Sequence, residues 1–266
     1  MADKYLSIIT NFGCHYKCPE CIVRNNNLKM SPTAERSSWG RLESALQDMP
    51  DANWVSVSGG GDPLFHWWEH QFWWKGFFHM CQQENRKTEL HTSYYDAAYN
   101  PQMLMFPLYI FDRVVYHCHH PEDLDDVGRV GREIVRVVFV VDDSMTEEII
   151  NDIANFVETS DQIDELSFRQ RIDDHYQPTY HLHDFLKAGH KKRWWYIEQC
   201  DYNTYYHNGD LFTKYTDIFS KYQKIIYLKL LFYKRMNNMT LIRLLFFAYF
   251  RSFSYVTQDT KRRNEN

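Results

Sequence analysis

The chain has 266 residues, of which 44 % are hydrophobic and 24 % are charged. This composition is typical of a folded globular protein and excludes an intrinsically disordered one. The net charge of −5 argues against a nucleic-acid-binding protein that works through bulk positive charge. No apolar segment has the length of a membrane span, which needs roughly 18 residues, and no signal-peptide pattern follows the start, so we expect a cytoplasmic protein.

Short β-rich runs alternate with longer helical patterns along the first 170 residues. Six strands are expected, at residues 5–10, 54–58, 88–92, 113–117, 135–141 and 165–169. Between the first two, Ser31-Pro32 is typical of a helix start, and apolar residues recur after it at helical spacing. Ser144 and Glu147 form a capping-box pattern that predicts the start of another helix.

Strands and helices that alternate at this spacing indicate parallel βαβ units. Six such units predict an α/β fold, a partial (βα)6 TIM-like barrel over residues 1–180, with C-terminal helical and hairpin additions over residues 181–266. Within these additions, residues 181–199 have a helical pattern. Residues 205–212 are typical of a hairpin around an Asn-Gly turn.

Residues 218–258 contain no Asp or Glu, but they carry seven Lys or Arg residues among Ile, Leu, Phe and Tyr. Three interpretations of this basic apolar tail stay open. The tail lies on a membrane surface or binds an acidic partner; it is a terminal helix that covers the open side of the barrel; or it is not native coding sequence.

Three of the six cysteines, Cys14, Cys18 and Cys21, follow the first strand in a C-x3-C-x2-C spacing. The others are scattered, at Cys81, Cys118 and Cys200. Clustered cysteines in a reducing compartment indicate a metal site. A structural zinc ion needs a fourth ligand, for which His15 is the candidate, whereas a four-iron cluster on three cysteines keeps one iron open for a ligand.

A glycine-rich segment, Ser58-Gly59-Gly60-Gly61-Asp62-Pro63, follows the second expected strand. Consecutive glycines let the backbone approach a ligand closely, although a tight strand-to-helix turn also favours Gly and Pro. Active sites of parallel βα folds form at the C-terminal ends of the strands. We therefore expect the cysteine loop and the glycine-rich segment to lie side by side on one face.

Together the two motifs resemble those of the radical S-adenosylmethionine (SAM) superfamily. The resemblance implies a [4Fe–4S] cluster held by Cys14, Cys18 and Cys21, and a SAM amino group held by a motif that is usually Gly-Gly-Glu-Pro. Asp62 stands in place of the Glu of that motif, and Glu20 in place of the usual aromatic residue before the third cysteine. The implied SAM contacts are Gly59, Gly60, Gly61, Asp62, Thr92, Ser93, His117 and Arg169.

Four of these contacts come from the ends of later strands. Thr92 and Ser93 follow the third strand, where the family often has a polar turn. His117 ends the fourth strand, where the family often contacts the SAM ribose; the alternative is an ordinary polar residue at a strand end. Arg169 ends the sixth strand and suits the SAM carboxylate; the alternative is a surface ion pair with Asp173 or Asp174.

The resemblance implies reductive cleavage of SAM to a 5′-deoxyadenosyl radical that takes hydrogen from a substrate. An external electron donor such as flavodoxin or ferredoxin is implied as a partner. The substrate, whether a peptide, a protein or a small metabolite, is not readable from the sequence. The competing hypothesis is a non-catalytic binding module stabilised by zinc or by an iron–sulfur cluster.

Overall fold

The computed structural model describes residues 4–10, 12–19, 21–25, 39–96, 108–131, 133–173, 177, 179, 194–197, 204–218, 220–221 and 227–228. The chain divides into two compact units, Met1–Phe219 and Ser220–Asn266, and the fold below is that of the first. Among the described residues, no helix has the length and apolar character needed to cross a membrane.

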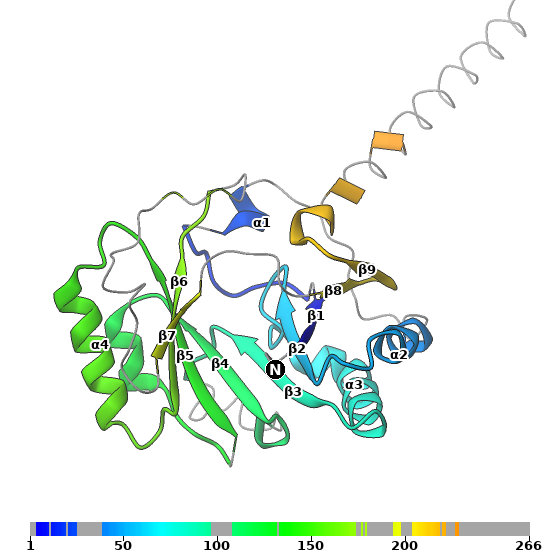
Figure 1. Cartoon of the computed structure of the whole chain (residues 1–266), viewed down its shortest axis with the longest axis horizontal. Helices are drawn as coiled ribbons and strands as arrows, with labels where there is room; N and C mark the ends of the chain where they lie inside the picture. The colour runs from blue at the N-terminus through cyan, green and yellow to red at the C-terminus, as the bar shows by residue number, and fades with distance from the viewer. Residues whose placement is uncertain are drawn as a thin grey trace, which may run out of the picture. The chain divides into compact units, whose positions relative to one another are not determined.

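The first unit is built on one nine-stranded sheet (Figure 1). Its strands are β1 (Tyr5–Thr10), β2 (Trp54–Gly59), β3 (Lys87–Thr92), β4 (Arg113–Cys118), β5 (Ile134–Val141), β6 (Glu165–Gln170), β7 (Trp194–Ile197), β8 (Thr204–His207) and β9 (Asp210–Phe212). They are ordered β7-β6-β5-β4-β3-β2-β1-β8-β9 across the sheet. All neighbours are parallel except the antiparallel pair β8 and β9. Among the described strands no pairing joins β7 to β9, so the sheet is an open partial barrel, as predicted.

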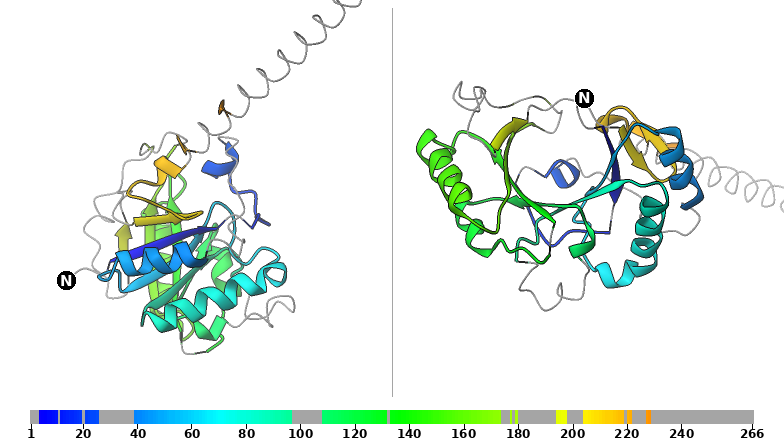
Figure 2. Two further views of the ribbon diagram at one scale, coloured as in Figure 1. Left: turned by 90° about the vertical axis from the view of Figure 1, so that its right-hand side faces the viewer. Right: turned by 60° about the horizontal axis from the view of Figure 1, so that its bottom comes forward.

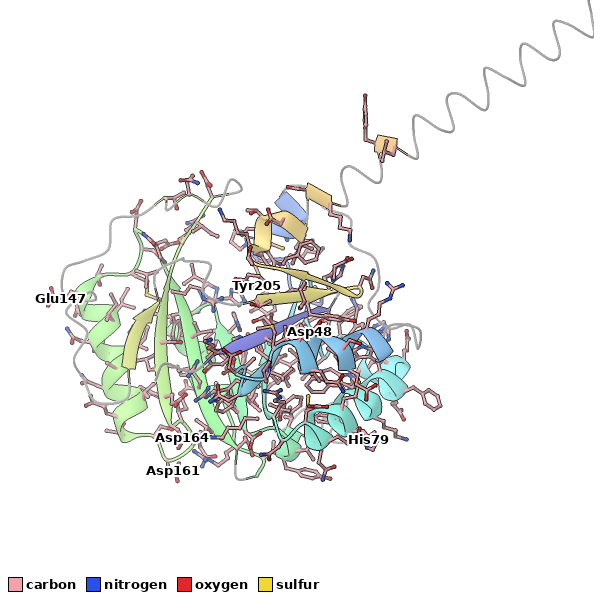
Figure 3. All side chains as sticks on the ribbon, turned by 45° about the vertical axis from the view of Figure 1, so that its right-hand side comes forward. Asp48, His79, Glu147, Asp161, Asp164 and Tyr205 are labelled. Carbon is pink, nitrogen blue, oxygen red and sulfur yellow. The ribbon has the colours of Figure 1, made fainter. Side chains whose placement is uncertain are left out.

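Helices cover the outer side of the curved sheet (Figure 2). The α-helices are α1 (Ile22–Asn25), α2 (Trp39–Asp48), α3 (Gln71–Gln83) and α4 (Glu147–Thr159), and the 3-10 helices are η2 (Trp67–His70), η3 (Leu108–Ile110) and η4 (Pro121–Asp126). Helices α2, α3 and α4 turn exposed side chains such as Asp48, His79 and Glu147 to solvent (Figure 3). The apolar sides of these three helices face the sheet.

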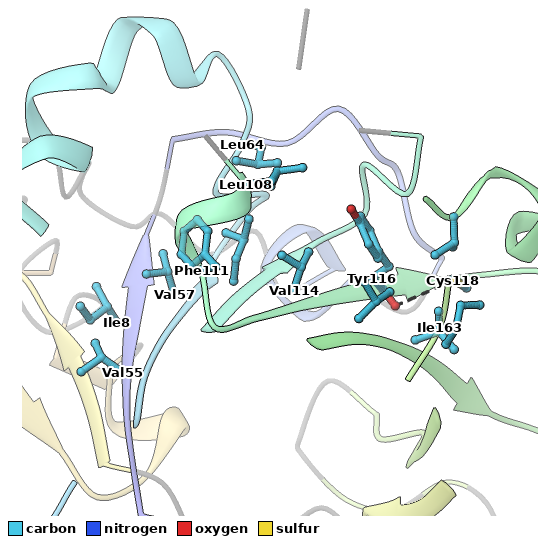
Figure 4. Close-up of a cluster of buried hydrophobic side chains, with 14 of the residues drawn as sticks. Ile8, Val55, Val57, Leu64, Leu108, Phe111, Val114, Tyr116, Cys118 and Ile163 are labelled. Atoms are coloured by element: carbon cyan, nitrogen blue, oxygen red, sulfur yellow. Dashed lines mark hydrogen bonds between the residues drawn. The ribbon is translucent and has the colours of Figure 1, made fainter. Parts of the chain in front are cut away.

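The core lies between these helices and the outer face of the sheet. Alternate strand residues such as Ile8, Val55, Val57 and Val114 are fully buried there, as Figure 4 shows. The helices contribute to the same core with Leu42, Leu46, Trp73, Trp74, Phe77, Ile150, Ile153 and Val157. Burial of each large apolar side chain contributes about 1.5–3 kcal/mol, so this layer holds the sheet in its curved shape.

The other strand residues, which alternate with these, form the inner face of the sheet. This face is largely polar, and its polar residues include Ser7, Ser56, Glu89, His91, Arg113, His117, Arg136, Glu165, Ser167 and Arg169. Successive side chains of a strand point to opposite faces. The sequence therefore places apolar residues beneath the helices and leaves chemically active ones on the inner side.

The structure confirms the six predicted strands to within one residue at either end. It also confirms the hairpin, in which Asn208 and Gly209 both have positive φ, 52° and 89°, as the favoured two-residue hairpin turn requires. Strands β7, β8 and β9 extend the same sheet beyond residue 180.

Two local predictions were wrong. Residues 194–197 form strand β7, paired with β6, and not part of a helix; residues 181–193 and 198–199 lie outside the described part of the chain. Helix α4 is capped by Thr146, whose Oγ1 accepts a hydrogen bond from the Ile149 amide. Ser144 instead donates to the Asp142 carboxylate, so it is not the cap. Ser31-Pro32 and most of the basic apolar tail also lie outside the described residues.

Candidate functional site

The loops that follow β1, β2, β3 and β4 meet at one edge of the sheet, because parallel strands have their C-terminal ends on the same side. The cysteine loop (residues 12–21) follows β1, and the glycine-rich segment follows β2. Two backbone hydrogen bonds hold the glycine-rich segment here: the Gly60 amide donates to the carbonyl of Thr10, the last residue of β1, and the Asp62 amide donates to the Gly13 carbonyl of the cysteine loop, each at 2.8 Å. The two motifs are therefore neighbours, as expected.

The glycines are explained by this close contact. A Cβ on Gly61 would lie 2.1 Å from the Gly13 carbonyl oxygen, and one on Gly59 would lie 1.9 Å from the Gly61 carbonyl oxygen. Gly13 itself has a φ of 115°, which side chains rarely tolerate. Gly13 was not predicted from the sequence, although its position directly before the first cysteine was a usable signal.

The three clustered cysteines are accessible thiols. Cys14 is exposed, Cys18 and Cys21 are partly buried, and none is in a disulfide. Partial desolvation of the thiol raises the pKa of Cys14, and the charges of Asp62, Cys18 and Cys21 raise it further, so the three thiols are electrostatic neighbours. Within the described residues, no three His, Cys, Asp or Glu side chains are gathered in a geometry that would hold a metal ion.

The chemistry of this donor set fits an iron–sulfur cluster. Soft thiolates select iron–sulfur clusters or zinc, and zinc would need a fourth ligand. His15, the sequence candidate for that ligand, stacks on Tyr94 with ring centroids 3.6 Å apart, and its Nδ1 lies 3.9 Å from Asp62 Oδ2. The His15 ring thus packs against the β2 and β3 loops, which argues against His15 as the fourth ligand of a zinc ion.

Asp62 joins the β2 and β3 loops. Its carboxylate, only 3 % exposed, accepts hydrogen bonds from the Leu64 amide at 2.9 Å, the Thr92 hydroxyl at 2.9 Å and the Ser93 amide at 2.7 Å. Burial raises the pKa of Asp62, although the amides of Ser93 and Leu64 oppose the shift. The structure therefore brings together three of the residues that the sequence analysis singled out.

His119 connects the β4 loop to the cysteines. Its Nε2 lies 3.6 Å from Cys18 Sγ, and its ring stacks on Tyr16 with centroids 4.3 Å apart. Tyr16 in turn shares a 3.0 Å hydrogen bond with the Tyr95 hydroxyl of the β3 loop. The cysteine loop is thus packed against both loops by aromatic rings. These contacts were not predicted from the sequence.

His117, at the end of β4, belongs to a hydrogen-bonded chain on the inner face. Its Nε2 lies 2.9 Å from His91 Nδ1, and His91 Nε2 lies 2.8 Å from Glu89 Oε1. Glu89 and His91 were not predicted from the sequence. The available signal was that both are ionisable residues at alternate positions of a strand that is buried from Thr88 to Leu90.

A network of charged residues covers the inner face near the N-terminal ends of the strands. Glu89 Oε2 accepts from Arg113 at 2.9 Å, and Arg136 Nε donates to Glu165 at 2.9 Å. Arg113 also lies 3.0 Å from Glu165 and stacks over the Trp54 ring at 4.2 Å. Each charge in this network has a partner of opposite charge. The network lies next to His91 and His117, on the side of the N-terminal ends of the strands.

Arg169 lies on the same inner face, near the C-terminal end of β6. Its Nε is buried without a hydrogen-bond partner in the described part of the chain. Among the described residues, no ion pair includes Arg169, and Asp174, one of its two expected partners, lies outside them. Burial lowers the pKa of both His91 and His117, and the nearby charge of Arg169 lowers it further. Arg169 is thus a cation on the inner face with donor capacity left over.

Comparisons with known proteins found similarity to solved structures, two of which are SuiB and BtrN. No family model and no curated protein matches the sequence. SuiB from Streptococcus suis, bound to S-adenosylmethionine, has a TM-score of 0.44 and 14 % identity over 74 % of this chain and 48 % of its own. BtrN in complex with AdoMet and 2-DOIA has a TM-score of 0.27 and 11 % identity over 74 % of this chain and 57 % of its own. The chain thus spans about half the length of the structures that it matches.

Proposed function

We propose that this chain is a radical SAM enzyme that reductively cleaves SAM at a [4Fe–4S] cluster. One observation carries the proposal: three accessible cysteines on the loop after β1 are hydrogen-bonded through their backbone loop to a glycine-rich segment after β2. Both lie at the C-terminal edge of a partial barrel, where βα folds place their active sites. Neither motif alone has this specificity.

Cys14, Cys18 and Cys21 are the residues that would hold the cluster. When bound, a cluster with three cysteine ligands supplies the electron that breaks the sulfonium bond of SAM. The electron comes from an external donor such as flavodoxin or ferredoxin. The protein's part is to position SAM beside the cysteine loop and to exclude water. The substrate, a peptide, a protein or a small metabolite, reaches the polar inner face of the sheet.

SAM lies along the loops that follow β2, β3, β4 and β6 in this proposal. Gly59, Gly60, Gly61 and Asp62 hold its amino group, and Thr92 and Ser93 line the adjoining turn. His117 accepts a hydrogen bond from a ribose hydroxyl. Arg169 binds the carboxylate, and the unpartnered buried Nε of its guanidinium supports this role.

The direct test is anaerobic purification, followed by iron and sulfide analysis and a SAM cleavage assay with dithionite as reductant. We expect about four irons and four sulfides per chain and the release of 5′-deoxyadenosine. Stoichiometric zinc in protein made and kept without oxygen, together with no cleavage of SAM, would overturn the proposal. That outcome would favour a zinc-stabilised binding module.

We expect the second compact unit to be dispensable for this chemistry. A chain that ends at residue 219 keeps Tyr215, whose hydroxyl donates to the Gly59 carbonyl at 3.3 Å, and the fully buried Ile218. It should fold, take up the cluster and cleave SAM at the rate of the full chain. A chain that ends at residue 203 is the control: it lacks β8, the parallel neighbour of β1, and should fail to fold. A folded, cluster-loaded 1–219 chain that no longer cleaves SAM would contradict the expectation.

A further inference from the structure

The Glu89–His91–His117 chain has one direction of hydrogen bonding. Burial by itself raises the pKa of Glu89, but the hydrogen bond from His91 and the attraction of Arg136 and Arg113 lower it overall. Glu89 is therefore an ionised carboxylate, which can only accept hydrogen bonds. His91 Nε2, 2.8 Å from it, must carry a hydrogen and donate.

The hydrogen bond between His91 and His117 has a fixed donor and acceptor as well. Burial lowers the pKa of His91 despite the nearby carboxylate, so the ring is neutral and its second nitrogen, Nδ1, carries no hydrogen. His117 Nε2, 2.9 Å from that nitrogen, must then be the donor. Burial, His91 and Arg169 hold the pKa of His117 well below its usual value, so this ring is neutral as well. The remaining nitrogen, His117 Nδ1, is left as a bare acceptor.

We propose that Glu89 and His91 are positioning residues that lock His117 with its hydrogen on Nε2, so that Nδ1 accepts a hydrogen bond from a ligand hydroxyl on the inner face. His117 is partly exposed, and its Nδ1 has no hydrogen-bond partner among the described residues. The inference rests on the proposed function, in which this hydroxyl belongs to the SAM ribose.

The arrangement of charges supports positioning over simple packing. Glu89 already has an ion pair with Arg113 through Oε2, so His91 is not needed to neutralise it. The second oxygen, Oε1, is directed to His91. The side chains of Glu89 and His91 are only 4 % and 14 % exposed, so water does not compete for these hydrogen bonds. A carboxylate that orients a histidine in this way is a recurrent means of fixing its tautomer.

The first test reads the tautomers directly from nitrogen-15 NMR spectra of the histidine side chains, in the full chain loaded with its cluster. In the native protein we expect His91 and His117 both to carry hydrogen on Nε2. Glu89→Gln should reverse His117, because Arg113 claims the amide oxygen and leaves the amide NH2 facing His91. Glu165→Gln removes the same charge beside the same two arginines and should leave both tautomers unchanged.

The second test measures SAM affinity by calorimetry. His91→Phe removes both hydrogen bonds of His91, to Glu89 and to His117. It should weaken SAM binding by about 2- to 10-fold, which is the contribution of one hydrogen bond. His91→Gln can donate to Glu89 and accept from His117, so it should restore most of the affinity. Because the spectra of Glu89→Gln and His91→Gln also report the His117 tautomer, the test stands even if His91→Phe fails to fold.

Three results would overturn the inference: a native His117 with hydrogen on Nδ1, an unchanged His117 tautomer in Glu89→Gln, or equal SAM affinity in native protein and His91→Phe. A native chain that loads no cluster or binds no SAM would instead overturn the proposed function. The spectra of that chain would still decide the tautomers, so the two failures are distinguishable.

Discussion

Replacement of Cys14, Cys18 or Cys21 by Ala is expected to abolish iron binding and the brown colour of the protein. Each replacement leaves two thiolates on the loop, and within the described residues no other Cys, His, Asp or Glu joins them in a metal-binding geometry. A loss of this size, from a full cluster to none, is the largest effect we expect from a single substitution. Iron and sulfide analysis and visible absorption of anaerobic protein measure it.

Cys81→Ala is the matched control for these variants. Cys81, a residue of α3, is 1 % exposed in the core, and burial raises its pKa to about 12, so it is an inaccessible thiol and not part of the cysteine loop. Cys81→Ala and Cys200→Ala should keep full iron content. An iron-loaded triple variant of Cys14, Cys18 and Cys21 would show that the cluster lies elsewhere in the chain.

Asp62→Ala is expected to weaken SAM binding by about 10- to 150-fold. A charge-assisted hydrogen bond to the SAM amino group contributes about 1.5–3 kcal/mol, which corresponds to that factor. The same change should also lower stability, because it leaves the Leu64 amide, the Thr92 hydroxyl and the Ser93 amide without their acceptor. Each buried donor without an acceptor costs about 1–3 kcal/mol.

Two further variants of Asp62 separate charge from shape. Asp62→Asn keeps the size, and we expect it to lose part of the SAM affinity. Asp62→Glu restores the residue that the radical SAM motif usually has, but the Asp62 carboxylate already accepts from three protein donors at 2.7–2.9 Å. An added methylene must displace them, and we expect a loss of stability of about 1–3 kcal/mol.

Asp164→Ala is the control for stability alone. Its carboxylate also accepts hydrogen bonds, from the Val135 amide and from Arg129. It lies directly before β6, at the N-terminal end of that strand, whereas the candidate site is at the C-terminal ends (Figure 3). Thermal melts should show a lower melting temperature for both alanine variants, whereas calorimetry on cluster-loaded protein should show weaker SAM binding only for Asp62→Ala. Unchanged SAM affinity in folded, cluster-loaded Asp62→Ala would reduce Asp62 to a residue that joins two loops.

The sequence was sufficient for the strands that carry long β-branched runs, such as residues 134–141, and for the Asn-Gly hairpin. It was insufficient for β7, a four-residue strand whose identity depends on pairing with β6. Short apolar runs of this kind do not distinguish helix from strand by periodicity. The cap of α4 was displaced for a local reason: the Asp142 carboxylate binds Ser144, so Thr146 is left as the residue that caps the helix.

In the candidate site, the residues that could be predicted were those of the two contiguous sequence motifs. The cysteine loop and the glycine-rich segment are each a few residues long, and the order of strands places them side by side. The Glu89–His91–His117 chain was not predictable in this way, because His91 and His117 are 26 residues apart and meet only through the register of β3 and β4. His119 and Cys18 are 101 residues apart.

The position of β1 in the sheet has a consequence for the order of folding. This strand, which leads into the cysteine loop, pairs with β2 on one side and with β8 on the other. The hydrogen bond from His207 to the Ile9 carbonyl spans 198 residues. At about 5–20 residues per second of synthesis, β1 waits about 10–40 s on the ribosome with one edge unpaired. An unpaired edge invites association with other chains, so the interval before β8 emerges is the period in which nascent chains of this protein are most prone to aggregate.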